Sequence, residues 1–186
     1  MKQYSSTNQT MNRFIAGAVL TLVIGGTAYT INQADVVKHF AADTGLSQEQ
    51  AEQYVSSVKD DDLVSYTELG DDYIDEGNDV LRIAHDINCS QYQYDWESPS
   101  LTCYIGKNQI TKMGNDEIAL GKAYKILDGD SAGTTEIQNT INLIDAYNKD
   151  FDLAVAKAVF SYSEIDEIKK NNSFNKALLK SALEGD

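Results

Sequence analysis

The sequence predicts a mainly helical domain with a small antiparallel β-hairpin or meander, which is held by a disulfide and preceded by one N-terminal apolar helix. Three observations lead to this fold class. Most of the chain beyond residue 34 places apolar residues at helical spacing. Residues 90–96 instead alternate strictly between two faces, as a strand does. An uncharged apolar run occupies residues 14–31.

The apolar run at residues 14–31 separates a polar tail, residues 1–13, from an acidic remainder, residues 35–186. Lys2 and Arg13 precede the run, and the first acid, Asp35, follows it. This asymmetry predicts that the N-terminus stays in the cytoplasm and that residues 35–186 form an extracytoplasmic domain. Two interpretations stay open for the run. It is a signal anchor, for which a membrane-spanning helix needs about 20 residues, or a signal peptide that is cleaved after the small residues 26–28.

The localisation that follows is an exported protein, with bacterial envelope as the expected setting. If the run is kept, the protein is single-pass and membrane-anchored; if the run is cleaved, the protein is periplasmic or secreted. Cys89 and Cys103 are the only cysteines of the chain, and they form no CxxC motif. In an oxidising compartment such a pair is expected to form a disulfide. Closing a loop of this length contributes about 3 kcal/mol in the chain-entropy model.

The expected hairpin covers residues 90–113. Residues 90–96 form its first strand, the turn at residues 97–100 contains Pro99, and residues 101–106 return, followed by a short third strand at residues 109–113. In this register Tyr94 lies opposite Cys103, and Trp96 is expected to pack inward beside it. Tyr92 lies nearer the open end of the hairpin, where it is a candidate for contact with a partner.

Helices are expected on both sides of this hairpin. Ser47 and Gln50 form a capping box at the start of the second helix. The expected helices cover residues 34–43, 47–58, 66–88, 115–127, 134–147, 150–162, 163–170 and 173–184.

The charge balance excludes one large class of functions. The formal net charge is −14, and Arg13 and Arg82 are the only arginines. Nucleic-acid binding needs clustered basic residues, so we expect none. Residues 114–122 carry two glycines and a lysine, but Ala123 stands where a phosphate-binding loop needs Ser or Thr. We therefore expect no nucleotide partner.

Two acidic stretches are candidate sites. Asp71, Asp75 and Asp79 follow one another at four-residue spacing in the expected helix 66–88. They are either a solvated helix start or, together with Tyr92, a docking surface for a basic partner. Asp128 and Asp130 resemble the start of a calcium loop, but the twelfth position lacks the bidentate Glu. They predict a weak calcium site at most, and otherwise a linker; no other cofactor is expected.

No residue is assigned a catalytic role. The two histidines, His39 and His85, have no nucleophile motif beside them, and both thiols are expected in the disulfide. The sequence therefore predicts a non-catalytic interaction protein, an acidic domain that engages another envelope or membrane protein. One alternative is a cell-wall glycan hydrolase with paired carboxylates, for which Glu68 and an Asp from residues 71–79 are the first pair to inspect. Another is a weakly cation-binding structural protein.

Overall fold

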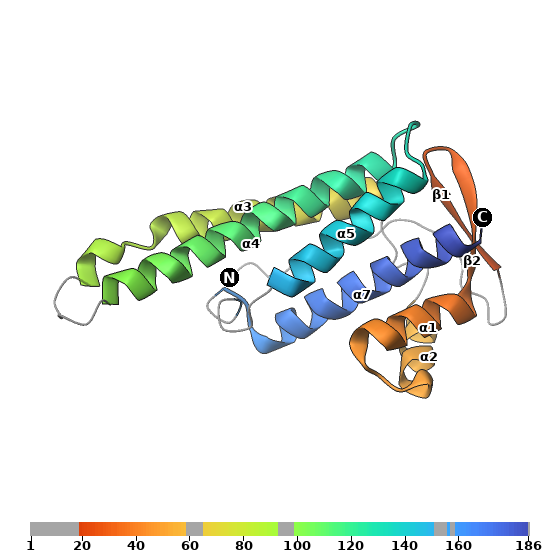
Figure 1. Cartoon of the computed structure of the whole chain (residues 1–186), viewed down its shortest axis with the longest axis horizontal. Coiled ribbons are helices and arrows are strands. Elements are labelled where there is room, and N and C mark those ends of the chain that lie inside the picture. The colour runs from red at the N-terminus through yellow and green to blue at the C-terminus, as the bar shows by residue number, and fades with distance from the viewer. Residues whose placement is uncertain (1–18, 59–64, 93–98, 151–155, 157–158, 186) are drawn as a thin grey trace.

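The protein is mainly helical in a computed structural model, which describes residues 19–58, 65–92, 99–150, 156 and 159–185 (Figure 1). This confirms the predicted helical class. The elements in chain order are β1 (Val19–Ile24), β2 (Thr27–Asn32), α1 (Gln33–Thr44), α2 (Gln48–Ser57), α3 (Tyr66–Asp86), the 3-10 helix η2 (Cys89–Tyr92), α4 (Pro99–Leu127), α5 (Thr134–Asp150) and α7 (Tyr162–Glu184).

Helices α3 and α4 form a long antiparallel hairpin that is the frame of the molecule (Figure 1). Their backbones touch at two glycine pairs. A Cβ atom built on Gly121 would lie 2.5 Å from the carbonyl oxygen of Gly70, and one built on Gly77 would lie 2.6 Å from that of Gly114. Since real Cβ atoms do not approach so closely, the two helices can pack at this distance only because glycine has no side chain.

The glycine pairs lie within a seven-residue pattern on each helix. The buried positions of α3 follow one another at spacings of four and three: Tyr66, Gly70, Tyr73, Gly77, Val80 and Ala84. Six buried residues of α4 have the same spacings: Ile110, Met113, Glu117, Leu120, Tyr124 and Leu127. The buried glycines of α4, Gly114 and Gly121, are seven residues apart beside this row. Such a repeat keeps one seam of each helix against its partner over many turns.

The disulfide closes the far end of this helical hairpin. The sulfur atoms of Cys89 and Cys103 lie 2.05 Å apart, which confirms the predicted pairing. Cys89 belongs to η2, directly after α3, and Cys103 lies in the second turn of α4. The bond therefore ties two helix ends together, whereas we had expected it to tie a helix end to a strand.

The predicted hairpin is wrong over the described residues 90–92 and 99–113, because residues 90–92 belong to the 3-10 helix η2 and residues 99–113 form the first half of α4. Pro99 is the first residue of that helix, a position at which its missing N–H would have had no helical partner in any case. The alternation of Leu101, Cys103 and Ile105 over one short stretch was outweighed by the seven-residue pattern that begins at Ile110. Tyr94 and Trp96 lie outside the described residues.

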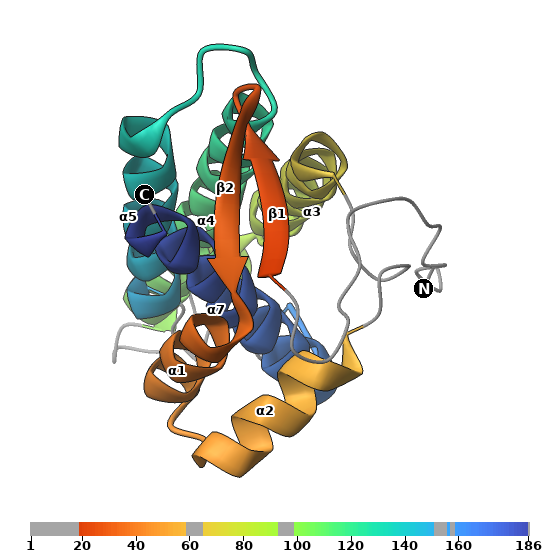
Figure 2. The same ribbon diagram turned by 90° about the vertical axis from the view of Figure 1, so that its right-hand side faces the viewer.

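The sheet of the described structure lies at the N-terminus instead. β1 and β2 pair antiparallel, with Ile24 opposite Thr27, and the turn between them has positive φ at Gly25 (58°) and Gly26 (74°). Two positive φ values in a two-residue turn match the twist of a hairpin. Figure 2 shows the two strands lying across the end of the helical bundle.

The predicted apolar helix at residues 14–31 is therefore wrong over the described residues 19–31. Leu22, Ile24, Tyr29 and Ile31 are buried, and buried positions alternate with exposed ones over residues 22–24 and 28–32. That two-residue period, with a Gly-Gly turn between the halves, favours a hairpin over a helix. None of the described helices is both long and apolar enough to cross a membrane.

The hairpin belongs to the folded unit, which thus begins before residue 35, the expected boundary. Ile24 and Ile31 are fully buried in the same core as Phe40 of α1, Leu127 of α4 and Leu179 of α7. The N–H of Gly25 donates to the carbonyl oxygen of Leu127 at 3.1 Å. At the other end of β2, the N–H of Asn32 donates to the Ser181 hydroxyl at 3.1 Å. These bonds join the hairpin to α4 and α7.

The remaining helices differ from expectation mainly in their ends. The capping box of Ser47 and Gln50 is confirmed at the start of α2. The segments predicted as separate helices at residues 163–170 and 173–184 form one helix, α7, which a second capping box of Ser161 and Glu164 begins. Asn172 and Ser173 face the interior of that helix packing, so the expected break at residue 173 does not occur. Most of the expected helix at residues 150–162 lies outside the described residues.

We predict that Gly121→Ala lowers the free energy of unfolding by about 1–3 kcal/mol, because the added methyl group overpacks the contact with Gly70. Gly106→Ala is the matched control in the same helix, since a Cβ atom there meets nothing within 4 Å. The control should stabilise the protein by about 0.5–1 kcal/mol through helix propensity. Urea unfolding measures both, and equal effects of the two substitutions would contradict the close approach of α3 and α4.

We further predict that Ile31→Ala destabilises the protein by about 2–5 kcal/mol, as expected for emptying a fully buried aliphatic site. Thr30→Ala, at the exposed neighbouring position of β2, should change the free energy of unfolding by less than about 0.5 kcal/mol. Thermal or urea unfolding of the two variants is the measurement. An Ile31→Ala protein as stable as the control would show that the N-terminal hairpin lies outside the core.

Candidate functional site

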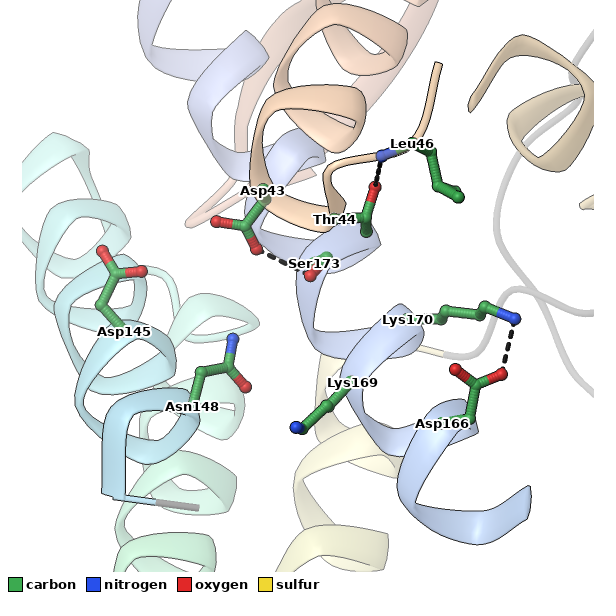
Figure 3. Close-up of a pocket in the computed structure, with 9 residues that line it drawn as sticks. All are labelled: Asp43, Thr44, Leu46, Asp145, Asn148, Asp166, Lys169, Lys170 and Ser173. Atoms are coloured by element: carbon green, nitrogen blue, oxygen red, sulfur yellow. Dashed lines mark hydrogen bonds and ion pairs between the residues drawn. The ribbon is translucent and has the colours of Figure 1, made fainter. Parts of the chain in front are cut away.

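A polar recess of about 390 Å³ lies between the C-terminal end of α1, the second half of α5 and the first half of α7 (Figure 3). Its volume is in the range of ordinary ligand pockets. Its lining differs from theirs, because carboxylates, lysines and amide or hydroxyl groups outnumber apolar side chains. The lining residues are Asp43, Thr44, Leu46, Asp145, Asn148, Asp166, Lys169, Lys170 and Ser173.

Lys176 of α7 links the three helices that line the recess, α1, α5 and α7. Its side chain is 9% exposed, and its ammonium group pairs with Asp43 of α1 and with Asp145 of α5. The Ser173 hydroxyl, one turn before Lys176, donates to the second oxygen of Asp43 at 2.7 Å. A buried ammonium needs such partners, because removing it from water is unfavourable. Two carboxylates of the recess lining, Asp43 and Asp145, are therefore fixed by one shared cation.

Hydrogen bonds within this network favour the ionised states of Asp43 and Lys176. Burial by itself would raise the pKa of Asp43, but hydrogen bonds from Lys176 and Ser173 outweigh it and hold that pKa below the ordinary value. Burial would likewise lower the pKa of Lys176, but its bonds to Asp145 and Asp43 raise it. Both groups thus stay ionised through the neutral range.

The rim of the recess carries further polar groups. Lys170 pairs with Asp166, one turn earlier in α7, at 2.6 Å. The Thr44 hydroxyl donates to the carbonyl oxygen of Phe40 at 2.7 Å and so closes the last turn of α1. Lys169 and Asn148 extend from α7 and α5 into the gap between these helices (Figure 3). The rim thus offers both positive and negative groups, together with an amide.

A second polar cluster lies deeper, between the α3–α4 hairpin and α5 and α7. Glu117 of α4 is fully buried, and one of its oxygens accepts a hydrogen bond of 2.5 Å from the Tyr147 hydroxyl. The Tyr73 hydroxyl donates to the Asn172 side chain, whose amide donates to Asn148 at 3.1 Å. Because Asn148 also lines the recess, the deeper cluster and the recess share one residue.

The acids that the sequence marked for a partner lie elsewhere, on the exposed face of α3. Asp71 pairs with Lys125 of α4 at 2.5 Å, and Asp79 pairs with Arg82 at 3.1 Å. Asp75 is exposed between them. Tyr92 belongs to η2, and its side chain lies outside the described set. The structure thus places the three acids on one face, as their spacing predicted, and separate from the recess.

The two residues of the suggested calcium loop lie in the turn between α4 and α5. A carboxylate oxygen of Asp128 accepts a hydrogen bond of 2.5 Å from the N–H of Thr67, at the start of α3. Asp130 is exposed. Among the described residues, no group of three or more His, Cys, Asp or Glu side chains is placed to hold a metal ion. Weak calcium binding at this turn stays a prediction.

Sequence reasoning missed both the recess and the buried carboxyl group. The residues of the recess come from three helices, and no local pattern connects Asp43, Asp145 and Lys176. Glu117 did have a signal, because it occupies a seam position between Met113 and Leu120 in the seven-residue pattern of α4. A carboxyl group at such a position predicts a buried, functional or strained site.

No protein-family model, curated protein or solved structure matches this chain.

We predict that Lys176→Met lowers the free energy of unfolding by about 1–3 kcal/mol, because two carboxylates lose a shared cation and one of them is half exposed. The ionised Asp43 stabilises the folded protein at pH values above 3.8, the ordinary pKa of this group, and this stabilisation is lost as the pH falls further. The difference in free energy of unfolding between the wild type and Lys176→Met should therefore shrink below pH 3.8. Urea unfolding at several pH values measures this.

Lys170→Met is the control for this prediction. Its ion pair with Asp166 is exposed and should contribute no more than about 0.5 kcal/mol. Adding Asp43→Asn and Asp145→Asn to Lys176→Met should recover most of the loss, since no unpaired charge then stays in the network. If Lys176→Met and Lys170→Met have equal effects, Lys176 does not join the three helices as described.

Proposed function

We propose that this protein is a non-catalytic interaction protein of the cell envelope, and that the recess between α1, α5 and α7 binds a charged segment of a partner protein. One observation carries the proposal. The three carboxylates of the recess are held by lysines of α7, Asp43 and Asp145 by Lys176 and Asp166 by Lys170. Such a lining is organised in advance for recognition, because its charges are already oriented before a ligand arrives.

The same ion pairs argue against acid–base chemistry in the recess. A glycan hydrolase needs one carboxyl group with a raised pKa as its general acid. The pKa of Asp43 is instead lowered by Lys176 and Ser173. The two carboxyl groups whose pKa values are raised to near neutrality, those of Glu117 and Glu76, do not line the recess, and Glu117 is fully buried, out of reach of a polysaccharide. We therefore place binding ahead of hydrolysis.

Charge favours a basic partner. The chain carries a net charge of −14, and α3 exposes Asp71, Asp75 and Asp79 along one face. Such a field accelerates association with a positively charged surface and is screened by salt. We propose that the α3 face steers a basic partner towards the protein, while the recess supplies the specific contacts.

The disulfide supports the proposed location. Disulfides persist in exported proteins and are rare in the cytosol of most cells, and Cys89 and Cys103 form one here. In the exported form that we propose, residues 19–32 are retained, because Ile24 and Ile31 are part of the core. The partner is accordingly proposed to be another envelope or membrane protein.

Site-specific photocrosslinking tests this function. We predict that a benzophenone amino acid at position 169, in the recess, forms an adduct with one envelope protein when irradiated in intact cells. The same group at Gln138, an exposed position of α5 that does not line the recess, is the control. Asp166→Lys should reduce the adduct about tenfold or more, because it places a second cation beside Lys170, and the two repel a basic segment.

The salt dependence adds a second test. Exchanging Asp71, Asp75 and Asp79 for Asn should slow association with the captured partner and leave its dissociation rate nearly unchanged, as screening by about 0.5 M salt does. Equal adducts at positions 169 and 138 would contradict the recess as the binding site. Capture of a cytosolic protein instead of an envelope protein would contradict the location.

A further inference from the structure

The buried carboxyl group of Glu117 is the most unusual feature of the interior. Its side chain is fully buried, and one oxygen accepts a hydrogen bond from Tyr147 of α5. The other oxygen, Oε2, has no hydrogen-bond partner among the described residues. On α3, Gly77 faces Glu117 and has no side chain. A Cβ atom built on Gly77 would lie 3.1 Å from the Cβ atom of Glu117. The side chain of Glu117 therefore begins directly against the backbone of α3, the helix that carries Glu76.

The charged groups that act on Glu117 are themselves acids. Glu76 of α3 is half-buried, and among the neighbouring acids its charge raises the pKa of Glu117 most. The described part of the chain shows no lysine or arginine paired with either carboxyl group. The titratable groups that face the pair are Asp72, Tyr73 and Asp79 of α3, Asp116 of α4, Tyr147 of α5, and Glu164 and Glu167 of α7.

We propose that Glu117 and Glu76 form a proton-binding pair inside the bundle, and that loss of the proton loosens the packing of α5 and α7 against the α3–α4 hairpin. Oε2 of Glu117 is the oxygen that carries the proton in the packed state. A carboxylate there would be a buried charge without a cation, which is far less favourable than a neutral carboxyl group with one unmade hydrogen bond.

The pKa directions agree with this geometry. Burial raises the pKa of Glu117 to about 8, with Glu76 and Asp116 adding to the shift, although the hydrogen bond from Tyr147 opposes it. Burial, followed by the charges of Glu164, Asp72, Asp79 and Glu167, raises the pKa of Glu76 to about 7. Because the two acids interact, they titrate as a pair, and the proton belongs to the pair.

The sign of the pH dependence follows from these shifts. An unfolded or opened chain releases the proton near the ordinary value of 4.5, whereas the packed state keeps it to about 8. Between these values the packed state binds more protons, so its stability falls as the pH rises. The contribution of this pair to the stability of the packed state is largest below pH 4.5. It is lost completely above about pH 8.

The contacts at this level show which helices should separate. The Tyr147–Glu117 bond joins α5 to α4, and the chain Tyr73–Asn172–Asn148 joins α3, α7 and α5. The glycine contacts and the disulfide lie within the α3–α4 hairpin, so they hold that pair together when the other contacts open. Because Asn148 lines the recess, opening would also change the recess; this last consequence rests on the proposed function, whereas the opening does not.

Hydrogen exchange of the isolated full chain tests the opening without any partner, so its outcome does not depend on the recess. The amide exchange of α5 and α7 is measured at pH 5.5, 6.5 and 7.5 and divided by the intrinsic rate at each pH. In the wild type the open fraction in these helices should rise by up to about tenfold per pH unit for each proton that the pair releases. The α3–α4 seam should change much less.

Glu117→Gln is the decisive variant, because a neutral amide of nearly the same shape replaces the proton-binding group. It should remove the share of the pH dependence in α5 and α7 that belongs to Glu117, and leave only the share of Glu76. Glu52→Gln, at an exposed position of α2, should behave as the wild type. The same pH dependence in the wild type and Glu117→Gln would overturn the proposal, and so would a uniform change over the whole chain.

A carboxyl-carbon NMR titration of Glu117 in the wild-type chain covers the case in which Glu117→Gln does not fold. A midpoint near 7–8 supports the proton-binding pair, and a midpoint below about 5 would overturn it.

Discussion

The close approach of α3 and α4 is the constraint on which the rest of the structure depends. Gly70 faces Gly121 and Gly77 faces Gly114, so two backbones meet where other helix pairs are held apart by side chains. The disulfide between Cys89 and Cys103 fixes the same pair at its far end. A two-helix hairpin of this length would otherwise be free to slide, because a seven-residue repeat fits a partner at more than one register. The glycine pairs and the disulfide together select one register.

The register of α3 and α4 then decides where polar groups enter the interior. It sets Glu117 against the bare backbone at Gly77, and it leaves Tyr73 and Tyr147 to fill the space on either side. Helices α5 and α7 close over this layer, and α7 carries Lys176 to the carboxylates of α1 and α5. The recess is the outer surface of that junction. The close packing of α3 against α4 thus determines where the polar residues of α5 and α7 lie.

The acidic residues of this chain lie in three different environments. Those on the exposed face of α3 stay in water, and two of them pair with Lys125 and Arg82. Those in the recess pair with lysines, and hydrogen bonds from Lys176 and Ser173 hold the pKa of Asp43 low. Glu117 is buried without a cation, which raises its pKa. Composition alone counts these groups as equal charges. Their chemistry differs because burial and the nearest partner decide which protonation state is stable.

The sequence by itself determined the features that depend on local chemistry: the helical class, the capping box at Ser47, the exposed acidic face of α3 and the pairing of two isolated cysteines. Only the tertiary structure decided the features that depend on distant partners. The alternation at residues 101–105 and the apolar run at residues 14–31 each allowed two conformations, and the core chose between them. The glycines of α3 and α4 carry no hydrophobic signal, although they set the packing distance. The recess needs three helices to meet around Lys176, and this happens only when the chain is folded, because its residues are far apart in sequence and share no local pattern.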